Sequence, residues 1–172
     1  DALRMSQAVG FPNGEVQALH GLGAALSALG DYEAARDHLE RALGRYRANE
    51  DPRGEVDVLV ERAWIAANIG DAREAAADGA QALELAEEIR SRPRQAEAAL
   101  VLGRSLAAEA HFDQAEAAYQ RALMMRRELG QEHLAVEAQA GLAQVALARG
   151  HYVEALNLLG PVLEALKRRP GL

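Results

Sequence analysis

Apolar residues recur along this chain in three- and four-residue steps, the spacing that places side chains on one face of an α-helix. Between Glu15 and Leu29 they occupy positions 16, 19, 22, 26 and 29. Gly30 can then end a helix in the left-handed conformation, and Asp31 is placed to cap the next one. The pattern therefore predicts a helix, a tight turn and a second helix that runs from about Tyr32 to Tyr46.

The same pattern returns every 40 residues without slippage. The turn column holds Gly30, Gly70, Ala110 and Gly150, and a second column holds Ala35, Ala75, Ala115 and Ala155. Further helices are expected over residues 54–69, 71–90, 93–109, 111–129, 131–149 and 151–168, with breaks between pairs near Pro12, Pro52, Arg92 and Gln131. A fixed period of this length indicates stacked supersecondary units, none of which buries its apolar face alone.

The repeats give the expected domain organisation and fold class. Residues 1–14 are expected to be half a repeat, the second helix of a preceding unit followed by a turn at Pro12-Asn13-Gly14. Four repeats then follow over about 15–54, 55–94, 95–134 and 135–172. We expect one continuous all-α solenoid of antiparallel helix pairs, wound as a right-handed superhelix. Solenoids need capped ends, so the natural protein is expected to extend beyond both termini, and Leu3 and Met5 to need a covering helix or a second copy.

The residues of the repeat carry a resemblance to the tetratricopeptide repeat family. The first full repeat supplies the family's large, small and aromatic positions as Leu19, Leu22-Gly23, Leu26, Gly30, Tyr32, Ala35, Leu39 and Ala42. The second repeat departs from the pattern, because Arg62 replaces a leucine and Gly79 stands where a large residue belongs. The repeat is also longer than the family's usual one. It resembles the long-repeat arms of bacterial signal-transduction ATPases and transcriptional regulators, which implies a binding module.

Composition narrows the classes of partner and compartment. The chain carries a net charge of −7, so it lacks the basic face that general nucleic-acid binding needs. No apolar run is long enough to span a bilayer, so no membrane partner is expected. Cysteine is absent, which fits a reducing compartment, and we expect a cytoplasmic protein.

Nothing in the sequence points to catalysis. The chain has no nucleophile elbow, phosphate-binding loop or dinucleotide fingerprint, and no cofactor is expected. His111 and His151 share one column at the interhelix turns, which suggests either a metal or pH-sensing ladder or ordinary solvated helix entries. We favour helix entries, because no histidine is paired at the spacing of metal ligands. The sequence therefore predicts a protein that is not an enzyme and holds no metal.

The resemblance implies a concave wall lined by the first helix of each pair. Carried onto this chain, the family's inward-facing positions include Asp57, Glu61, Trp64 and Asn68 in the second repeat, Glu97 and Arg104 in the third, and Glu137 and Gln144 in the fourth. They also include Val60, Leu100, Val101, Ala140 and Gly141. We expect Trp64, Arg104 and Gln144 to be neighbours, because they share one position of adjacent repeats.

Two of these features have more than one interpretation. Trp64 is either an aromatic anchor for a partner or a side chain buried against the neighbouring repeat. The acids Asp57, Glu97 and Glu137 either select a basic partner or occupy first helical turns, where they favour the helix dipole. We favour the dipole interpretation.

Two functions follow from these observations. The first is a non-catalytic interaction or sensor module of a larger regulatory protein, which binds a peptide, a protein or its own neighbouring domains in the concave groove. The alternative is a structural spacer or self-association element that stacks through its uncapped ends and has no specific groove ligand.

Overall fold

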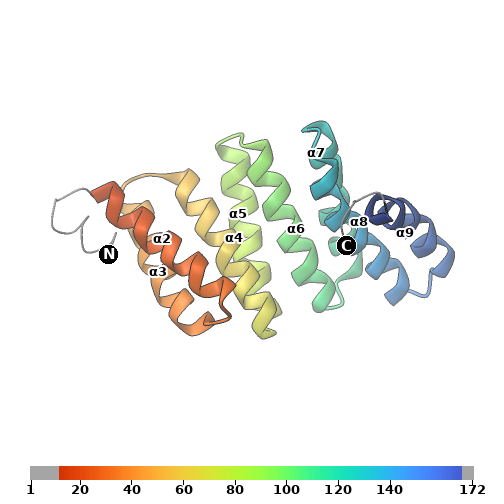
Figure 1. The fold of residues 1–172 in the computed structure, drawn as a ribbon, viewed down its shortest axis with the longest axis horizontal. Coiled ribbons are helices and arrows are strands. Elements are labelled where there is room, and N and C mark those ends of the chain that lie inside the picture. Colours follow the sequence, from red (N-terminus) through yellow and green to blue (C-terminus); the bar gives the residue numbers. More distant parts are fainter. Residues whose placement is uncertain (1–11, 168–172) are drawn as a thin grey trace.

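The computed structural model describes residues 12–167, and this part of the chain is an all-α solenoid without strands. Its helices are α2 (Pro12–Ala28), α3 (Tyr32–Ala48), α4 (Pro52–Ile69), α5 (Ala72–Glu88), α6 (Arg92–Ala108), α7 (Phe112–Glu128), α8 (Glu132–Ala148) and α9 (Tyr152–Lys167). They stack in chain order along the long axis of the molecule (Figure 1). The predicted fold class is confirmed, as are the turns near Gly30, Gly70, Ala110 and Gly150 and the breaks near Pro52, Arg92 and Gln131.

The first two helix pairs begin earlier than the sequence pattern suggested. The expected turn at Pro12-Asn13-Gly14 is wrong, because these residues form the first turn of α2. In the same way α4 begins at Pro52 rather than at Gly54. Proline fits a helix start because the missing amide has no intrahelical partner there. Leu3, Met5 and most of the half repeat predicted over 1–14 lie outside the described residues.

All turns between successive helices have one geometry, whether they lie within a pair or between pairs. Each contains one residue with a positive φ, at positions 30, 50, 70, 90, 110, 130 and 150. The next amide donates to the carbonyl five residues back, as from Asp31 to Leu26 (3.0 Å) and from His111 to Leu106 (2.9 Å). This is the bonding of a Schellman C-cap. The structural spacing is therefore 20 residues, half the period seen in the sequence.

The helices form two layers. The first helices α2, α4, α6 and α8 contact one another across repeats, whereas α3, α5, α7 and α9 contact only their neighbours in the chain. The layer of first helices is therefore the closer-packed, inner side of the curve. The expected concave wall of first helices agrees with this closer packing and remains a prediction.

Small residues allow this close packing. A Cβ on Gly23 of α2 would lie 2.7 Å from the side chain of Leu39 in α3, closer than real contacts allow. The alanine column is fully buried between helices, as at Ala35 and Ala115. A Cβ on Gly79, which departs from the family pattern, would lie 3.2 Å from the backbone of Leu102, so the glycine lets α5 approach α6.

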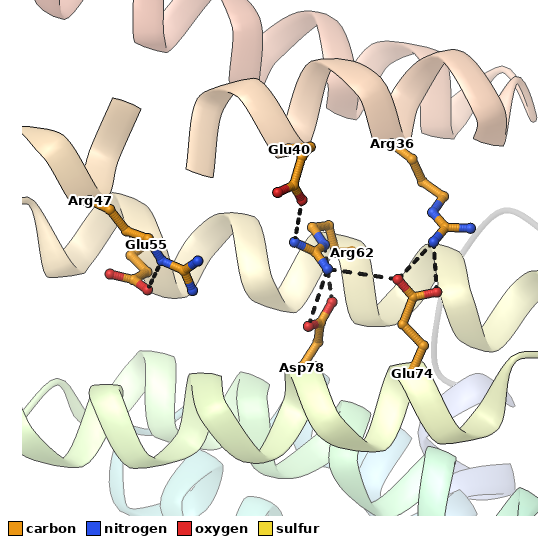
Figure 2. Close-up of polar contacts among 7 residues, drawn as sticks. All are labelled: Arg36, Glu40, Arg47, Glu55, Arg62, Glu74 and Asp78. Carbon is orange, nitrogen blue, oxygen red and sulfur yellow. Dashed lines mark hydrogen bonds and ion pairs between the residues drawn. The ribbon is translucent and has the colours of Figure 1, made fainter. Parts of the chain in front are cut away.

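Arg62, the other departure, is the centre of an ion-pair network (Figure 2). From α4 it reaches Glu40 on α3 at 2.7 Å and Asp78 on α5, whose Oδ2 lies 3.1 Å from the arginine Nε. Glu74 lies 3.7 Å from Arg62 and binds Arg36 of α3 through both oxygens. The backbones of the second helices α3 and α5 are not in contact with each other, so these ion pairs are what connects the two helices across the outer layer.

Candidate functional site: a groove between the first helices

The inner layer contains a cavity of about 780 Å³ centred on α6 and α8. Its lining comes from four helices: Trp64 of α4, Glu97, Leu100 and Arg104 of α6, Tyr119 of α7, and Glu137, Ala140, Gly141 and Gln144 of α8. A second hollow of about 340 Å³ shares Arg104, Tyr119 and Gln144 with it and continues toward Ala108 and Ala148. Together they form a groove that follows α6 and α8.

Trp64 and Arg104 are in direct contact. The guanidinium carbon of Arg104 lies 4.9 Å from the centre of the indole, the geometry of a cation–π pair. Its Nη2 donates to Oδ1 of Asn68 at 3.0 Å. With Gln144 on the same cavity wall, the predicted neighbourhood of Trp64, Arg104 and Gln144 is confirmed.

The environment of Trp64 combines the two interpretations open from the sequence. The side chain is half-buried and packs against the apolar clusters on both sides of it, those of repeats one and two and of repeats three and four. It also lines the cavity. The indole therefore joins two halves of the core and presents its remaining surface to the groove.

Tyr119 forms the floor of the cavity, a role that the sequence did not reveal. It comes from the outer helix α7 and passes between the inner helices, where its ring lies against Gly103 of α6 and Gly141 of α8. A Cβ on Gly141 would lie 2.4 Å from this ring. Burial raises the pKa of Tyr119 to about 12, so the phenol is neutral at ordinary pH. The only hint in the sequence was a glycine on each of two successive first helices, Gly103 and Gly141, at different positions of the repeat.

The dipole interpretation of the acidic row is wrong. Asp57 and Glu97 lie beyond the first turns of α4 and α6, and arginines hold them instead. Asp57 accepts two hydrogen bonds from Arg94 at 2.7 Å, which raise the pKa of Arg94. Glu97 accepts from Arg126, which is only 5% exposed. Asp57 thus links α4 to α6 of the next pair, and Glu97 links α6 to α7 within its own pair.

The remaining predicted residues divide between the groove and its surroundings. Glu137 lines the cavity and is exposed, and no described residue forms an ion pair with it. Asp57 and Glu61 do not line the cavity. Val60 and Val101, expected on the wall, are buried in the core instead.

The described residues contain neither a metal site nor a membrane span. Within residues 12–167 no group of three His, Asp or Glu side chains is arranged to hold a metal ion. His111 and His151 each lie near one glutamate, at 3.6 and 3.4 Å. None of the described helices has the length and apolar character that crossing a membrane requires.

The described helices form an all-α solenoid of antiparallel pairs, and the comparisons with known proteins bear on this fold. A tetratricopeptide repeat family model matches residues 1–48, which confirms the resemblance over the first full repeat. The later repeats continue the same helix pairs to residue 167. No curated protein sequence matches the chain.

Solved structures share the fold over nearly the whole chain. BtubC (BKLC) from P. vanneervenii superposes with a TM-score of 0.79 at 19% identity, over 94% of this chain and 68% of that one. The apo form of RapI gives 0.84 at 14% identity, over 98% and 48%. A Rap protein in complex with competence and sporulation factor gives 0.77 at 18% identity, over 86% and 42%. The chain thus spans less than half of either Rap protein, and identities this low show the fold alone.

Proposed function

We propose that this chain is a non-catalytic interaction module that binds a peptide or protein segment in the groove between α6 and α8. The observation that carries the proposal is the cavity itself, where an indole, a guanidinium and an amide converge on one wall. Tryptophan and arginine are enriched among residues that dominate binding energy. A similar Rap protein has been crystallised in complex with competence and sporulation factor, which supports a separate binding partner for a chain of this fold.

We further propose that the module serves a larger regulatory or signalling protein in the cytoplasm. The chain covers only part of the similar Rap proteins, and a solenoid segment can present its groove to neighbouring domains as well as to a separate partner. The absence of cysteine fits a reducing compartment.

Peptide selection tests the groove without knowledge of the natural partner. A phage library of random dodecapeptides would be panned on the immobilised protein, and the selected peptides resynthesised for calorimetric titration. Trp64→Ala should weaken binding by about 2 kcal/mol or more, because it removes a central anchor. Gln144→Ala should weaken it as well, while Val153→Ala, on an exposed surface away from the groove, should not.

The helical circular dichroism of each variant provides the control. Trp64 also packs in the core, so loss of binding counts only where the helical signal is retained. Selected peptides that bind the Trp64 and Gln144 variants as tightly as the unaltered protein would rule out this groove as the binding site.

The alternative, a self-association element, is favoured by a different surface. Helix α9 exposes Tyr152 (67%), Val153 (74%) and Leu156 (69%). The equivalent residues one repeat earlier include the polar Asp113 and Glu116. An apolar patch in place of charges is typical of a contact surface.

A further inference from the structure

The cavity is polarised along its length. Glu97 and Arg104 lie seven residues apart on α6, and Glu137 and Gln144 lie seven apart on α8. Seven residues are two helical turns, so the members of each pair share a face about 10 Å apart. One end of the cavity therefore carries carboxylates, and the other carries a guanidinium and an amide.

Each end retains one charge without a counter-charge. Glu97 is matched by Arg126, but no described residue forms an ion pair with Glu137. Arg104 bonds the neutral amide of Asn68 and covers Trp64, and it meets no carboxylate in the described chain. Arg94, on the same helix, is held by both oxygens of Asp57. Arg94, outside the cavity, is thus neutralised by Asp57, whereas Arg104, inside the cavity, can still pair with an acidic group of a ligand.

The middle of the cavity holds an unused hydrogen-bonding group. Tyr119 is 3% exposed and lines the cavity, yet its hydroxyl has no hydrogen bond to any described residue. The other buried tyrosine that crosses between inner helices, Tyr46, has the ring nitrogen of His20 at 3.4 Å from its hydroxyl. The hydroxyl oxygen is not one of the fully buried unpaired atoms, so it is open to the cavity and can exchange hydrogen bonds with a ligand there.

We infer that the cavity binds an extended peptide segment with a basic and an acidic side chain three residues apart. This inference rests on the proposed function and specifies its ligand. The basic side chain pairs with Glu137, the acidic one with Arg104 and Gln144, and a backbone group between them bonds the Tyr119 hydroxyl. A peptide in the extended polyproline II conformation advances about 3.1 Å per residue and has three residues per turn. Side chains three residues apart therefore share one face and lie about 9 Å apart, close to the roughly 10 Å between the two ends. The cavity volume lies within the usual range of ligand sites.

Blocked hexapeptides test the inference by calorimetric titration of the whole chain. The dipolar probe is acetyl-Gly-Arg-Leu-Ala-Glu-Gly-amide, and the neutral probe has glutamine in place of both charged residues. The dipolar probe should bind at least 10-fold more tightly than the neutral one. Glu137→Gln and Arg104→Gln should each reduce that preference several-fold, and 0.5 M salt should reduce it too, since exposed charges are screened.

Control variants that remove the same charges outside the cavity show whether the preference comes from the cavity or from the overall electrostatic field of the protein. Glu132→Gln on α8 and Arg127→Gln on α7 remove the same charges outside the cavity and should leave the preference unchanged. Tyr119→Phe, which keeps the ring between Gly103 and Gly141, should weaken both probes by about 2- to 10-fold, the range for one hydrogen bond.

The outcomes distinguish this inference from the proposed function. Equal binding of both probes, or a preference insensitive to Glu137→Gln and Arg104→Gln, would overturn the dipolar ligand. The groove would still stand if Trp64→Ala abolished binding of peptides selected from the library. Failure of the dipolar probe to bind at all also overturns the inference, and failure of the library to yield any groove-dependent peptide overturns the proposed function.

Discussion

At the residue scale, the second repeat places a charged pair at two positions that the third repeat fills with apolar side chains. Arg62 occupies the column of Leu22, Leu102 and Leu142. Asp78, 7% exposed, lies in the column of Ala118. Burial raises the pKa of Asp78, and the nearby Arg62 opposes that rise. Arg62 and Asp78 are therefore interdependent, because the charge of each offsets the cost of burying the charge of the other.

A double substitution tests this dependence. Arg62→Leu alone should lower the free energy of unfolding by roughly 3 kcal/mol, because it leaves a buried carboxylate without its main counter-charge. Arg62→Leu combined with Asp78→Ala recreates the residues of the third repeat and should recover most of the loss. Urea denaturation followed by circular dichroism measures both. A double variant no more stable than Arg62→Leu would show that the charges are not coupled.

The same pair predicts a pH dependence. The folded pKa of Asp78 lies above that of an unfolded aspartate, so the folded state holds a proton longer as the pH rises. As the pH rises from the unfolded pKa of Asp78 to its folded pKa, Asp78 increasingly destabilises the folded state. At pH values above the folded pKa, this destabilisation is constant. Arg62→Leu should therefore destabilise the protein less in acid than at neutral pH.

At the element scale, identical turns set the repeat. Three of the residues with positive φ are not glycine: Glu50 (53°), Arg90 (53°) and Ala110 (59°). This conformation costs about 1 kcal/mol or more for residues with a Cβ. The chain accepts that cost because each turn closes a C-cap and aligns the next helix for packing, as Leu106 and His111 do across Ala110.

Two alanines near one turn should respond oppositely to glycine. Ala110→Gly should raise the free energy of unfolding by up to about 1 kcal/mol, since glycine adopts the left-handed conformation without strain. Ala108→Gly, two residues earlier in the last turn of α6, should lower it by about 0.5–1 kcal/mol. Thermal and urea midpoints of the two variants give the comparison. The same sign for both would mean that the turn conformation is not what limits stability here.

At the scale of the whole molecule, the outer layer is charged at one position of the first three repeats and apolar at the same position of the last helix, α9. Val153 is 74% exposed, and the equivalent residues Glu33, Arg73 and Asp113 are exposed and charged even where a following repeat is present. Addition of another repeat would therefore leave Val153 uncovered. Val153 therefore lies on a surface distinct from the end of the stack, whereas Tyr152, whose equivalents at 32, 72 and 112 are half-buried, lies at its edge.

Sedimentation velocity tests whether this surface joins two copies of the chain. We expect the unaltered protein to self-associate with increasing concentration. Val153→Asp combined with Leu156→Glu, which supplies the residues of the third repeat, should restore a monomer and leave helicity unchanged. A monomer at 100 µM for the unaltered chain would exclude self-association through α9 and leave the groove as the functional surface.

The sequence alone determined the architecture, because the repeat pattern is local. Apolar spacing fixed which residues form helices, and the Gly30 column fixed where pairs turn. It also placed Trp64, Arg104 and Gln144 side by side, since equal positions of stacked repeats are adjacent.

Only the tertiary structure decided how side chains from different helices share space. Tyr119 reaches the groove from the outer layer because Gly103 and Gly141 leave room for it, and no single helix reveals that path. In the sequence, Asp57 and Glu97 resemble acids of a first helical turn. In the folded protein they form ion pairs with Arg94 and Arg126. Whether a charge is neutralised or free to bind depends on distances between residues far apart in the chain, which periodicity does not encode.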